Sequence, residues 1–367
     1  MEKAKLQIEL NNRPYEKDMV YAAVSLRGGY VTRDFIVDDS HFASNCAFYN
    51  VLFNYYRLMD VVSGLHYDIQ RAVSTVSLGR KKADFISALA DVLRILFNHE
   101  YDSEKFDAAK QNTREAFALQ YKNGAFRSKY KGYEFSDLNK RFTLKQLIND
   151  IEAITFEDFV RIANTIVVPG NVCIYILGDC RELDFSMLPN KVCVRQSALV
   201  RIAGYGFDPY LRQDAHIINK AREDYNLVIE ALDFLNGDCT NFTKMLITEL
   251  LAEQVSAHEI DVWVDSLDAS IMFSSEQLRE YKSLLKIDAE KTYNVAHKSL
   301  LIKYALLLEN SPEQFSIKAS HMMSVGVYVD QYLGFLDKCS YELFAELCEK
   351  ANYKITEAQI VLRKESK

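Results

Sequence analysis

Residues 142–179 read FTLKQLINDIEAITFEDFVRIANTIVVPGNVCIYILGD, and this stretch gives the clearest sign of the fold. Its middle part, TFEDFVRIANTIV, predicts a short helix, and VCIYILGD predicts a strand that closes on Gly-Asp. The same order returns near the end of the chain, where SYELFAELCEKANY (340–353) is followed by AQIVL (358–362). Two parts of one chain that close in the same way suggest an internal repeat.

Four short matches indicate a duplicated domain. Each pairs a segment of the first half with one of the second half, in the same order and at offsets of 185 to 193 residues. A shared order and offset argue for duplication. The matched pairs are VSGLHYDI (62–69) with VSAHEIDV (255–262), DSEK (102–105) with DAEK (288–291), FEDF (156–159) with YELF (341–344), and FYNVLFNYYRLM (48–59) with FLNGDCTNFTKML (234–246).

Both halves predict a similar series of strands and helices. Strands and helices mixed without strict βαβ alternation predict an α+β fold, with two homologous domains that each have a mostly antiparallel sheet covered by helices on one face. The expected elements are opening strands at 19–29 and 214–221, helices at 40–59 and 223–235 (the second continuing past Gly237 through TNFTKMLITELLAEQ), strand pairs at 65–79 and 259–275, and two further helices of the first half at 85–98 and 103–121.

The domain boundary is expected at LPNKVCVRQSALVRIAGYGFDP, residues 188–209. This stretch has two prolines, two glycines and no long period, which is typical of a linker. We therefore expect a first domain at 1–187, a linker at 188–209 and a second, homologous domain at 210–367.

Composition narrows the class of protein. Of the 367 residues 49% are apolar, which excludes wholesale disorder, and a net charge of −7 without a long basic run argues against nucleic acid or an anionic membrane surface as partner. No stretch of 18 apolar residues predicts a membrane span, and the polar start MEKAKLQIELNNRPYEKD has no secretory or transit signal. Seven cysteines without a C-x-x-C pair fit a reducing compartment. We expect a cytoplasmic protein.

Several stretches resemble the insulinase/pitrilysin family of zinc metallopeptidases, including its mitochondrial processing peptidase type. Residues 142–179 resemble the end of that family's first domain, and VSLRGGYVTRD (24–34) resembles its opening strand. YDSEKFDAAKQNTREAF (101–117) resembles the long helix that carries the family's third zinc ligand. The resemblance covers nearly the whole chain and lies in pattern rather than in an invariant motif.

The resemblance implies a zinc helix that has lost its chemistry. The family binds zinc through H-x-x-E-H, in which two histidines hold the metal and the glutamate is the general base. The matching stretch here is HFASN at 41–45, on the expected helix 40–59. His41 fills the first histidine position, Ser44 replaces the glutamate and Asn45 replaces the second histidine. A serine hydroxyl is a poor general base and an asparagine amide is a weak zinc ligand.

The third zinc ligand of the family would fall near Asp107, with Glu104 and Glu115 close by. A plainer interpretation of the segment is also open: Ser40 could cap an ordinary helix next to Asp38 and Asp39, with His41 and Asn45 as solvated first-turn residues. A metal site rebuilt around His41, His66 or His99 is a third possibility, although the histidines of this chain form no i, i+3 or i, i+4 ligand cluster. No nucleophile elbow or flanked cysteine signature is present.

The resemblance also implies a place for a peptide. In the family, substrate adds to an exposed edge strand, where main-chain hydrogen bonds give affinity with little sequence demand. The matching stretch is RAVSTVSL (71–78), centred on Ser74, Thr75 and Val76, which could equally be an ordinary paired strand. Arg57 and Tyr67 are weak matches to the family's substrate-contacting Arg/Tyr pair, and could equally have no special role.

These expectations lead to a non-catalytic subunit. It would have no cofactor of its own and would form a heterodimer with an active, zinc-binding homologous subunit, as in the bacterial two-subunit members of the family. The pair would enclose and orient a peptide, for example during leader removal from a modified peptide. Two alternatives stay open: an active zinc peptidase with a displaced metal site, and a purely architectural subunit.

Overall fold

The computed structural model describes residues 5–29, 32, 34–38, 41–59, 62–70, 72–98, 100–121, 144–189, 191–197, 225–256, 262–265, 270–274 and 289–362. The chain divides into two compact units. The first unit contains Met1–Ala118, Asn139–Leu199 and, from far along the chain, Leu306–Tyr332. The second unit contains the remaining residues. A segment from the C-terminal half is therefore an integral part of the first unit.

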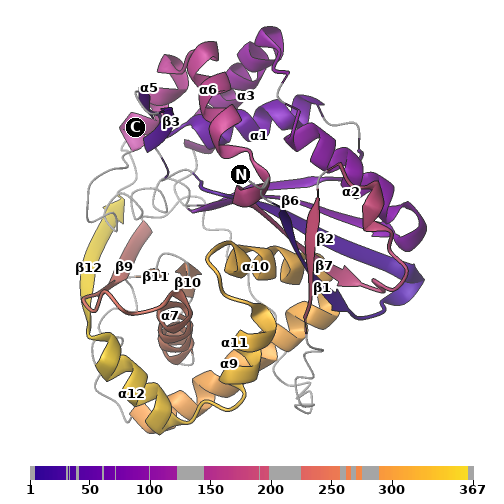
Figure 1. Ribbon diagram of the computed structural model, residues 1–367. Coiled ribbons are helices and arrows are strands. Elements are labelled where there is room, and N and C mark those ends of the chain that lie inside the picture. Colours follow the sequence, from indigo (N-terminus) through magenta and orange to yellow (C-terminus); the bar gives the residue numbers. More distant parts are fainter. Residues whose placement is uncertain are drawn as a thin grey trace. The chain divides into compact units, whose positions relative to one another are not determined.

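The first unit is built on a six-stranded sheet with the strand order β5-β6-β2-β7-β1-β8 (Figure 1). Four strands are joined by antiparallel pairing, while β1 pairs in parallel with both β7 and β8. The strands are β1 (Leu6–Asn12), β2 (Met19–Arg27), β5 (His66–Ile69), β6 (Val73–Lys81), β7 (Val172–Gly178) and β8 (Val192–Gln196). The mostly antiparallel α+β architecture expected from the sequence is confirmed.

One face of this sheet carries the main core. Side chains alternate along a strand, so Val20, Ala22, Val24 and Leu26 of β2 all point to the same face, where each is at most 2% exposed. Burial of each large apolar side chain contributes roughly 1.5–3 kcal/mol.

The helices of the first unit's N-terminal and central segments are α1 (Phe48–Met59), α2 (Lys82–Leu96), α3 (Ser103–Tyr121), α5 (Leu144–Ala153) and α6 (Phe156–Ile166).

The opposite face of the sheet is covered as well, by α10 (Pro312–Ser324). Figure 1 shows α1 and α2 on one side of the sheet and α10 on the other. The expectation of helices on one face was therefore incomplete for this sheet. Strand β7, VCIYILG, is buried along its whole length, as an almost continuous apolar strand between two covered faces should be.

The closing stretch of the first unit folds as its sequence indicates. Helix α6 starts at a cap in which the hydroxyl of Thr155 accepts a hydrogen bond from the backbone N–H of Asp158 at 3.1 Å. After α6 come the 3-10 turn Pro169–Asn171 and strand β7. The remaining 3-10 turns of the first unit are Glu16–Asp18 and Phe185–Met187.

The second unit has a four-stranded antiparallel sheet with the order β10-β11-β9-β12. Its strands are β9 (Tyr225–Phe234), β10 (Val262–Asp265), β11 (Ser270–Ser274) and β12 (Tyr353–Leu362). These four strands correspond in chain order to β2, β5, β6 and β7 of the first sheet, with β9 in the place of β2, β10 of β5, β11 of β6 and β12 of β7. The corresponding strands have the same neighbours and pair in the same antiparallel direction. This shared topology supports the predicted duplication.

Helices of the C-terminal half complete the description. They are α7 (Asn241–Ser256), α9 (Ala289–Asn310), α11 (Val329–Leu336) and α12 (Tyr341–Ala351). Helix α7 lies between β9 and β10 in the chain, as α1 lies between β2 and β5. Helix α12 is capped by Ser340, whose hydroxyl accepts from the backbone N–H of Leu343, and it ends at Asn352 in the left-handed conformation.

Three sequence expectations need correction. The helix expected at 40–59 begins only at Phe48, because 41–44 form strand β4. The helix expected at 223–235 is wrong over 225–234, which form β9; its short apolar stretches, interrupted by single polar residues, fit a short helix and a strand equally well. Within the expected linker, 192–196 form β8 and pair with β1. The expected opening strand at 214–221 lies outside the described residues.

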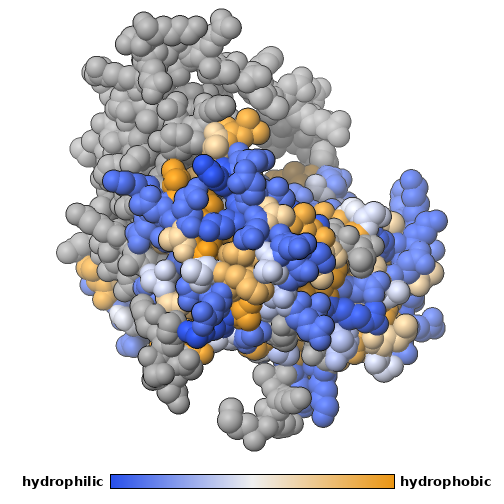
Figure 2. All heavy atoms as spheres, turned by 90° about the horizontal axis from the view of Figure 1, so that it is seen from above, coloured by the Kyte–Doolittle hydropathy of each residue, from blue (hydrophilic) through white to orange (hydrophobic). Residues whose placement is uncertain are grey.

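The surface of the described residues is predominantly hydrophilic on the face shown in Figure 2, where apolar side chains lie between polar ones. No helix among the residues that the structure describes is long and apolar enough to cross a membrane.

Gly28 provides a test of the packing between the end of β2 and α1. It has a φ of +104°, and a Cβ built on it would lie 1.9 Å from the hydroxyl oxygen of Tyr49. We predict that Gly28→Ala lowers the free energy of unfolding by about 2 kcal/mol or more, through backbone strain and this clash. The control Gly334→Ala has open space within helix α11 and should be neutral or stabilise by roughly 0.5–1 kcal/mol. Denaturant unfolding would check both, and an unchanged midpoint for Gly28→Ala would contradict the packing described here.

Candidate functional site

The segment that matches the zinc motif does not form a helix. Residues 41–44 form β4, which pairs with β3 (Asp34–Asp38) in an antiparallel hairpin. A strand rises about 3.3 Å per residue, so residues four apart along it are separated by about 13 Å rather than by one helical turn. His41 and Asn45 are therefore not a helical i, i+4 ligand pair.

Asn45 has a structural role that uses both ends of its amide. Its Oδ1 accepts from the backbone N–H of Ala47 at 2.8 Å, and its Nδ2 donates to the carbonyl of Asp150 at 3.0 Å. The Asp150 carboxylate in turn accepts from the backbone N–H of Cys46 at 2.7 Å. Asn45 is 6% exposed, and these bonds fix the turn that leads into α1.

Ser44 points away from this turn. It is exposed, and its hydroxyl donates to Asp34 Oδ1 across the hairpin at 3.0 Å. On the other face of the hairpin Phe35 is buried and packs against the Phe48 ring, with 5.3 Å between ring centroids. The sequence held a sign of this hairpin, since FIV and HFA flank Asp-Asp-Ser, residue types that favour turns.

The proposed third ligand, Asp107, lies on α3 with an exposed side chain, as do Glu104 and Glu115. The face of α3 that contacts the rest of the unit is formed by Phe106, Ala109, Thr113 and Phe117. Thr113 accepts a hydrogen bond from Asn54 Nδ2 of α1 at 2.8 Å. This amide–hydroxyl bond is one of the contacts between α3 and α1; another joins Lys105 Nζ to Met59 Sδ at 3.1 Å.

The donor set at 41–45 does not fit a catalytic zinc. Such a site needs three histidine, carboxylate or thiolate ligands around one point, and Ser44 and Asn45 supply neither a ligand nor a base. Within the part of the chain that the structure describes, no three His, Cys, Asp or Glu side chains come together as a metal group. Of the histidines considered for a rebuilt site, His66 lies exposed on β5 and His99 lies outside the described residues.

The expected edge strand proves to be an interior strand. Residues 73–81 form β6, which pairs with β2 on one side and β5 on the other. Ser74, Thr75 and Val76 are at most 1% exposed. Because β6 has a neighbour on each side, their main-chain groups are already paired in the sheet. The edge strand is β5 instead, since it comes first in the strand order and pairs only with β6 among the described strands.

The register of β5 shows which main-chain groups face outward. The backbone N–H of Gln70 donates to the carbonyl of Val73 at 2.9 Å, which makes Gln70–Val73 a hydrogen-bonded pair. Such pairs alternate along an antiparallel ladder, so Asp68 and His66 bond to β6 while Tyr67 and Ile69 direct their N–H and C=O groups outward. Ile69 is therefore the residue at which another strand could add.

Arg57 and Tyr67 do come together in the structure. The Arg57 guanidinium lies 5.4 Å from the centroid of the Tyr67 ring, and its Nη2 donates to the outward Tyr67 carbonyl at 3.2 Å. Nη1 donates to Asn54 Oδ1 at 3.2 Å. The pair thus lies at the sheet edge.

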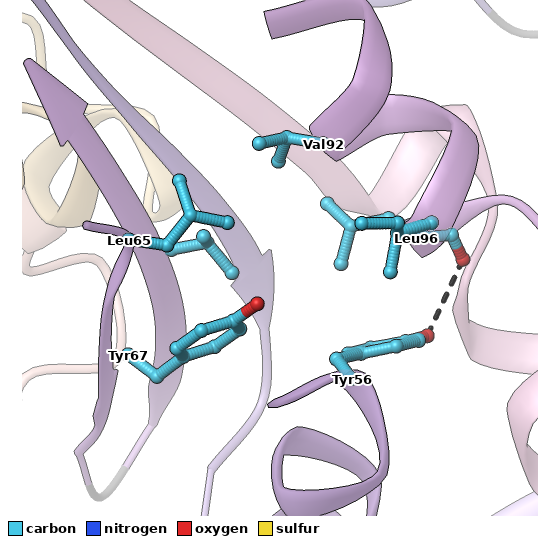
Figure 3. A pocket seen from close by; sticks show the side chains of 7 residues that line it. Tyr56, Leu65, Tyr67, Val92 and Leu96 are labelled. Atoms are coloured by element: carbon cyan, nitrogen blue, oxygen red, sulfur yellow. Dashed lines mark hydrogen bonds between the residues drawn. The ribbon is translucent and has the colours of Figure 1, made fainter. Parts of the chain in front are cut away.

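The space beneath the edge strand is filled by core side chains (Figure 3). Tyr67 and Leu65 lie across from Tyr56, whose hydroxyl donates to the carbonyl of Leu96 at 3.3 Å. The gap between them is too narrow for a water molecule. A ligand would therefore meet this part of the sheet at its edge rather than in a pocket behind it.

An open depression of about 340 Å³ lies where β2 ends. Its lining includes Arg27, Gly28, Asp34, Tyr49 and Ile166, which come from β2, the hairpin, α1 and α6. Arg27 is engaged there by carbonyls, since its Nε donates to Ser324 at 2.8 Å and its Nη1 donates to Gly170 at 3.3 Å. This arrangement does not specify a ligand.

Sequence reasoning missed β5 as the edge. HYDI is short, and short edge strands are a common way to limit uncontrolled pairing. That length, compared with the nine residues of β6, was the available signal.

Comparison with known proteins establishes the fold. No family model matches the sequence, and no curated protein matches it. Three solved structures align over nearly the whole chain. They are an M16-like peptidase from Alicyclobacillus acidocaldarius (TM-score 0.64, 13% identity, 95% of this chain and 94% of that one), a peptidase M16 inactive domain from Pseudomonas fluorescens (0.61, 12%, 97% and 95%), and a chain in complex III2 from Candida albicans (0.59, 11%, 95% and 93%). The chain has an M16-like peptidase fold.

Introducing the H-x-x-E-H residues at 41–45 should not create a zinc site. We predict that Ser44→Glu with Asn45→His binds no stoichiometric zinc, because 41–45 form a strand and turn, and that it lowers the free energy of unfolding by about 1–2 kcal/mol through loss of the Asn45 bonds. The control Asn45→Ala should give a similar loss of stability. Metal analysis after dialysis against zinc would check this, and one tightly held zinc per chain in the double variant would contradict it.

Proposed function

We propose that this chain is a non-catalytic, M16-like subunit that holds an extended peptide at the outer edge of β5 for a homologous, zinc-bearing partner. The observation that carries the proposal is the outward N–H and C=O groups of Ile69 on an edge strand, next to Tyr67, whose outward carbonyl accepts from Arg57. A peptide could pair with them as an added strand, a mode in which main-chain bonds provide affinity.

The donor chemistry at 41–45 supports the non-catalytic part of the proposal. Asn45 is engaged by Ala47 and Asp150, and Ser44 offers a hydroxyl where the family uses a carboxylate. Zinc and the general base would then come from the partner subunit, in a heterodimer. The solved inactive M16 domain provides a precedent for this fold without activity, in that protein.

The substrate class follows from the edge strand. Main-chain pairing favours peptides that are extended and unstructured, including leader segments of modified peptides. The Arg57 guanidinium beside Tyr67 adds a positive charge near the peptide path. The cysteine usage fits a cytoplasmic location for this processing.

A purely architectural subunit is the second candidate, favoured by the chain of this fold in complex III2 from Candida albicans. It predicts a stable partner and no peptide binding. An active peptidase with a displaced metal site is the third possibility, and it predicts chelator-sensitive cleavage by this chain alone.

Ile69 allows a direct test of strand addition. We predict that Ile69→Pro weakens peptide binding about tenfold or more, because proline removes an outward N–H and places its ring at the edge while the ladder to β6 stays bonded. The matched control Ile69→Ala keeps the N–H and should bind within about threefold of wild type. The probe is a fluorescein-labelled tryptic digest of casein, followed by fluorescence anisotropy.

Two results would count against peptide capture at this edge. Equal binding by Ile69→Pro and Ile69→Ala would show that the peptide does not use the outward groups of β5. No binding by the wild-type chain, either alone or with its co-purifying partner, would favour the architectural alternative.

A further inference from the structure

The face of the first sheet that lies under α10 is polar, although it is buried. Ser25 of β2, Thr75 of β6 and Ser320 of α10 are each at most 1% exposed, and His321 of α10 is 8% exposed. They form a chain of hydrogen bonds: His321 Nε2 to Thr75 at 2.8 Å, Thr75 to Ser25 at 2.8 Å, and Ser25 to Ser320 at 2.7 Å. These bonds attach the C-terminal segment to two neighbouring strands.

The direction of this chain follows from its last member. The Ser320 hydroxyl donates to the carbonyl of Ile317 at 2.9 Å, and a hydroxyl has one proton to give. Ser320 therefore accepts from Ser25, Ser25 accepts from Thr75, and Thr75 accepts from His321. This order assigns a proton to Nε2 of the imidazole, which acts as the donor at the head of the chain.

The hydrogen-bond chain from α10 reaches β6, the strand next to the proposed peptide edge. Thr75 is directly paired with Asp68 of β5, within the ladder that holds β5 against β6. A second bond of α10 reaches the same strand, since Ser77 of β6 donates to Glu313 at 2.6 Å. Helix α10 thus supports β6 from the face opposite the core, and β6 in turn carries the edge strand.

We propose that His321 is a positioning residue for the peptide edge, whose neutral imidazole keeps α10 docked and β5 ordered, and whose protonation loosens both. The peptide part of this inference rests on the proposed function. The docking part rests on the hydrogen-bond chain and on the burial of the imidazole: a second proton would enter at Nδ1, leave the Nε2 bond to Thr75 in place and put a charge into this buried site.

Several charges face this imidazole or its immediate surroundings. Asp68 of β5 favours the charged form, while Lys318 of α10 opposes it. Glu313 of α10 and Arg27 of β2 are engaged elsewhere at the same interface, by Ser77 and by the Ser324 carbonyl. On β7, burial raises the pKa of the Cys173 thiol to about 12, so this group stays neutral.

Burial is the largest influence and lowers the pKa of His321 from 6.5 to about 4. Because the docked form binds the proton less well than the released form, docking is fully favoured above pH 6.5 and weakens as the pH falls from 6.5 toward 4.

The experiment follows amide exchange in 312–324 and 66–78 of the full chain between pH 7.5 and 5, corrected for intrinsic rates, together with binding of the labelled casein peptides. Wild type should lose protection and affinity on acidification.

His321→Gln keeps an N–H donor without titrating, so it should bind normally at pH 7.5 and show a flat profile. His321→Leu should bind more weakly at pH 7.5. The control His66→Gln removes the exposed histidine of β5 and should keep the wild-type profile.

A wild-type pH response in His321→Gln, or its loss in His66→Gln, would overturn the inference. Asp68→Asn gives a second test in a chain that keeps His321: removing this carboxylate takes away the attraction that favours the protonated imidazole in the docked form, so the loss of protection at low pH should become larger, and a smaller loss would count against the inference. If no variant binds peptide, the proposed function fails, while the exchange profile of 312–324 still decides whether His321 controls docking.

Discussion

A sheet leaves main-chain N–H and C=O groups unpaired only along its edges, and this constraint decides where the first unit could bind an extended chain. The strand order places β5 at one edge, with β6 paired on both sides behind it. Tyr67 and Ile69 then face outward, and Arg57 lies beside them. The two faces of the same sheet are covered by different parts of the chain, α1 and α2 on one and α10 on the other.

The sequence predicted the fold better than it predicted the site. Residues 155–179 were interpretable because the helix cap at Thr155, the Pro-Gly-Asn turn and the apolar β7 are local signals. Strand order is set by contacts between distant segments, so the sequence leaves open whether RAVSTVSL is an edge strand or a paired strand; the structure pairs it on both sides and places HYDI at the edge. His321 bonds to Thr75 across 246 positions, a contact for which no local pattern exists.

The segment 41–45 differs in local structure from the helix that the family resemblance implies. HFASN lies where the family resemblance places the zinc motif, yet it forms a strand and a turn held by Asn45 and Asp150. A prediction based on helical spacing was wrong there, because the turn-favouring sequence Asp-Asp-Ser between FIV and HFA favours a hairpin. The fold of M16-like peptidases is thus present with a donor set that suits structure rather than zinc chemistry.

The most direct test of the account is metal content and peptide cleavage, measured on the chain purified without an affinity tag from its native host and again on the chain alone. The account predicts no stoichiometric zinc and no cleavage for the chain alone, and one zinc with chelator-sensitive cleavage for a complex whose second chain carries H-x-x-E-H. One zinc per chain together with cleavage by the isolated chain would contradict it.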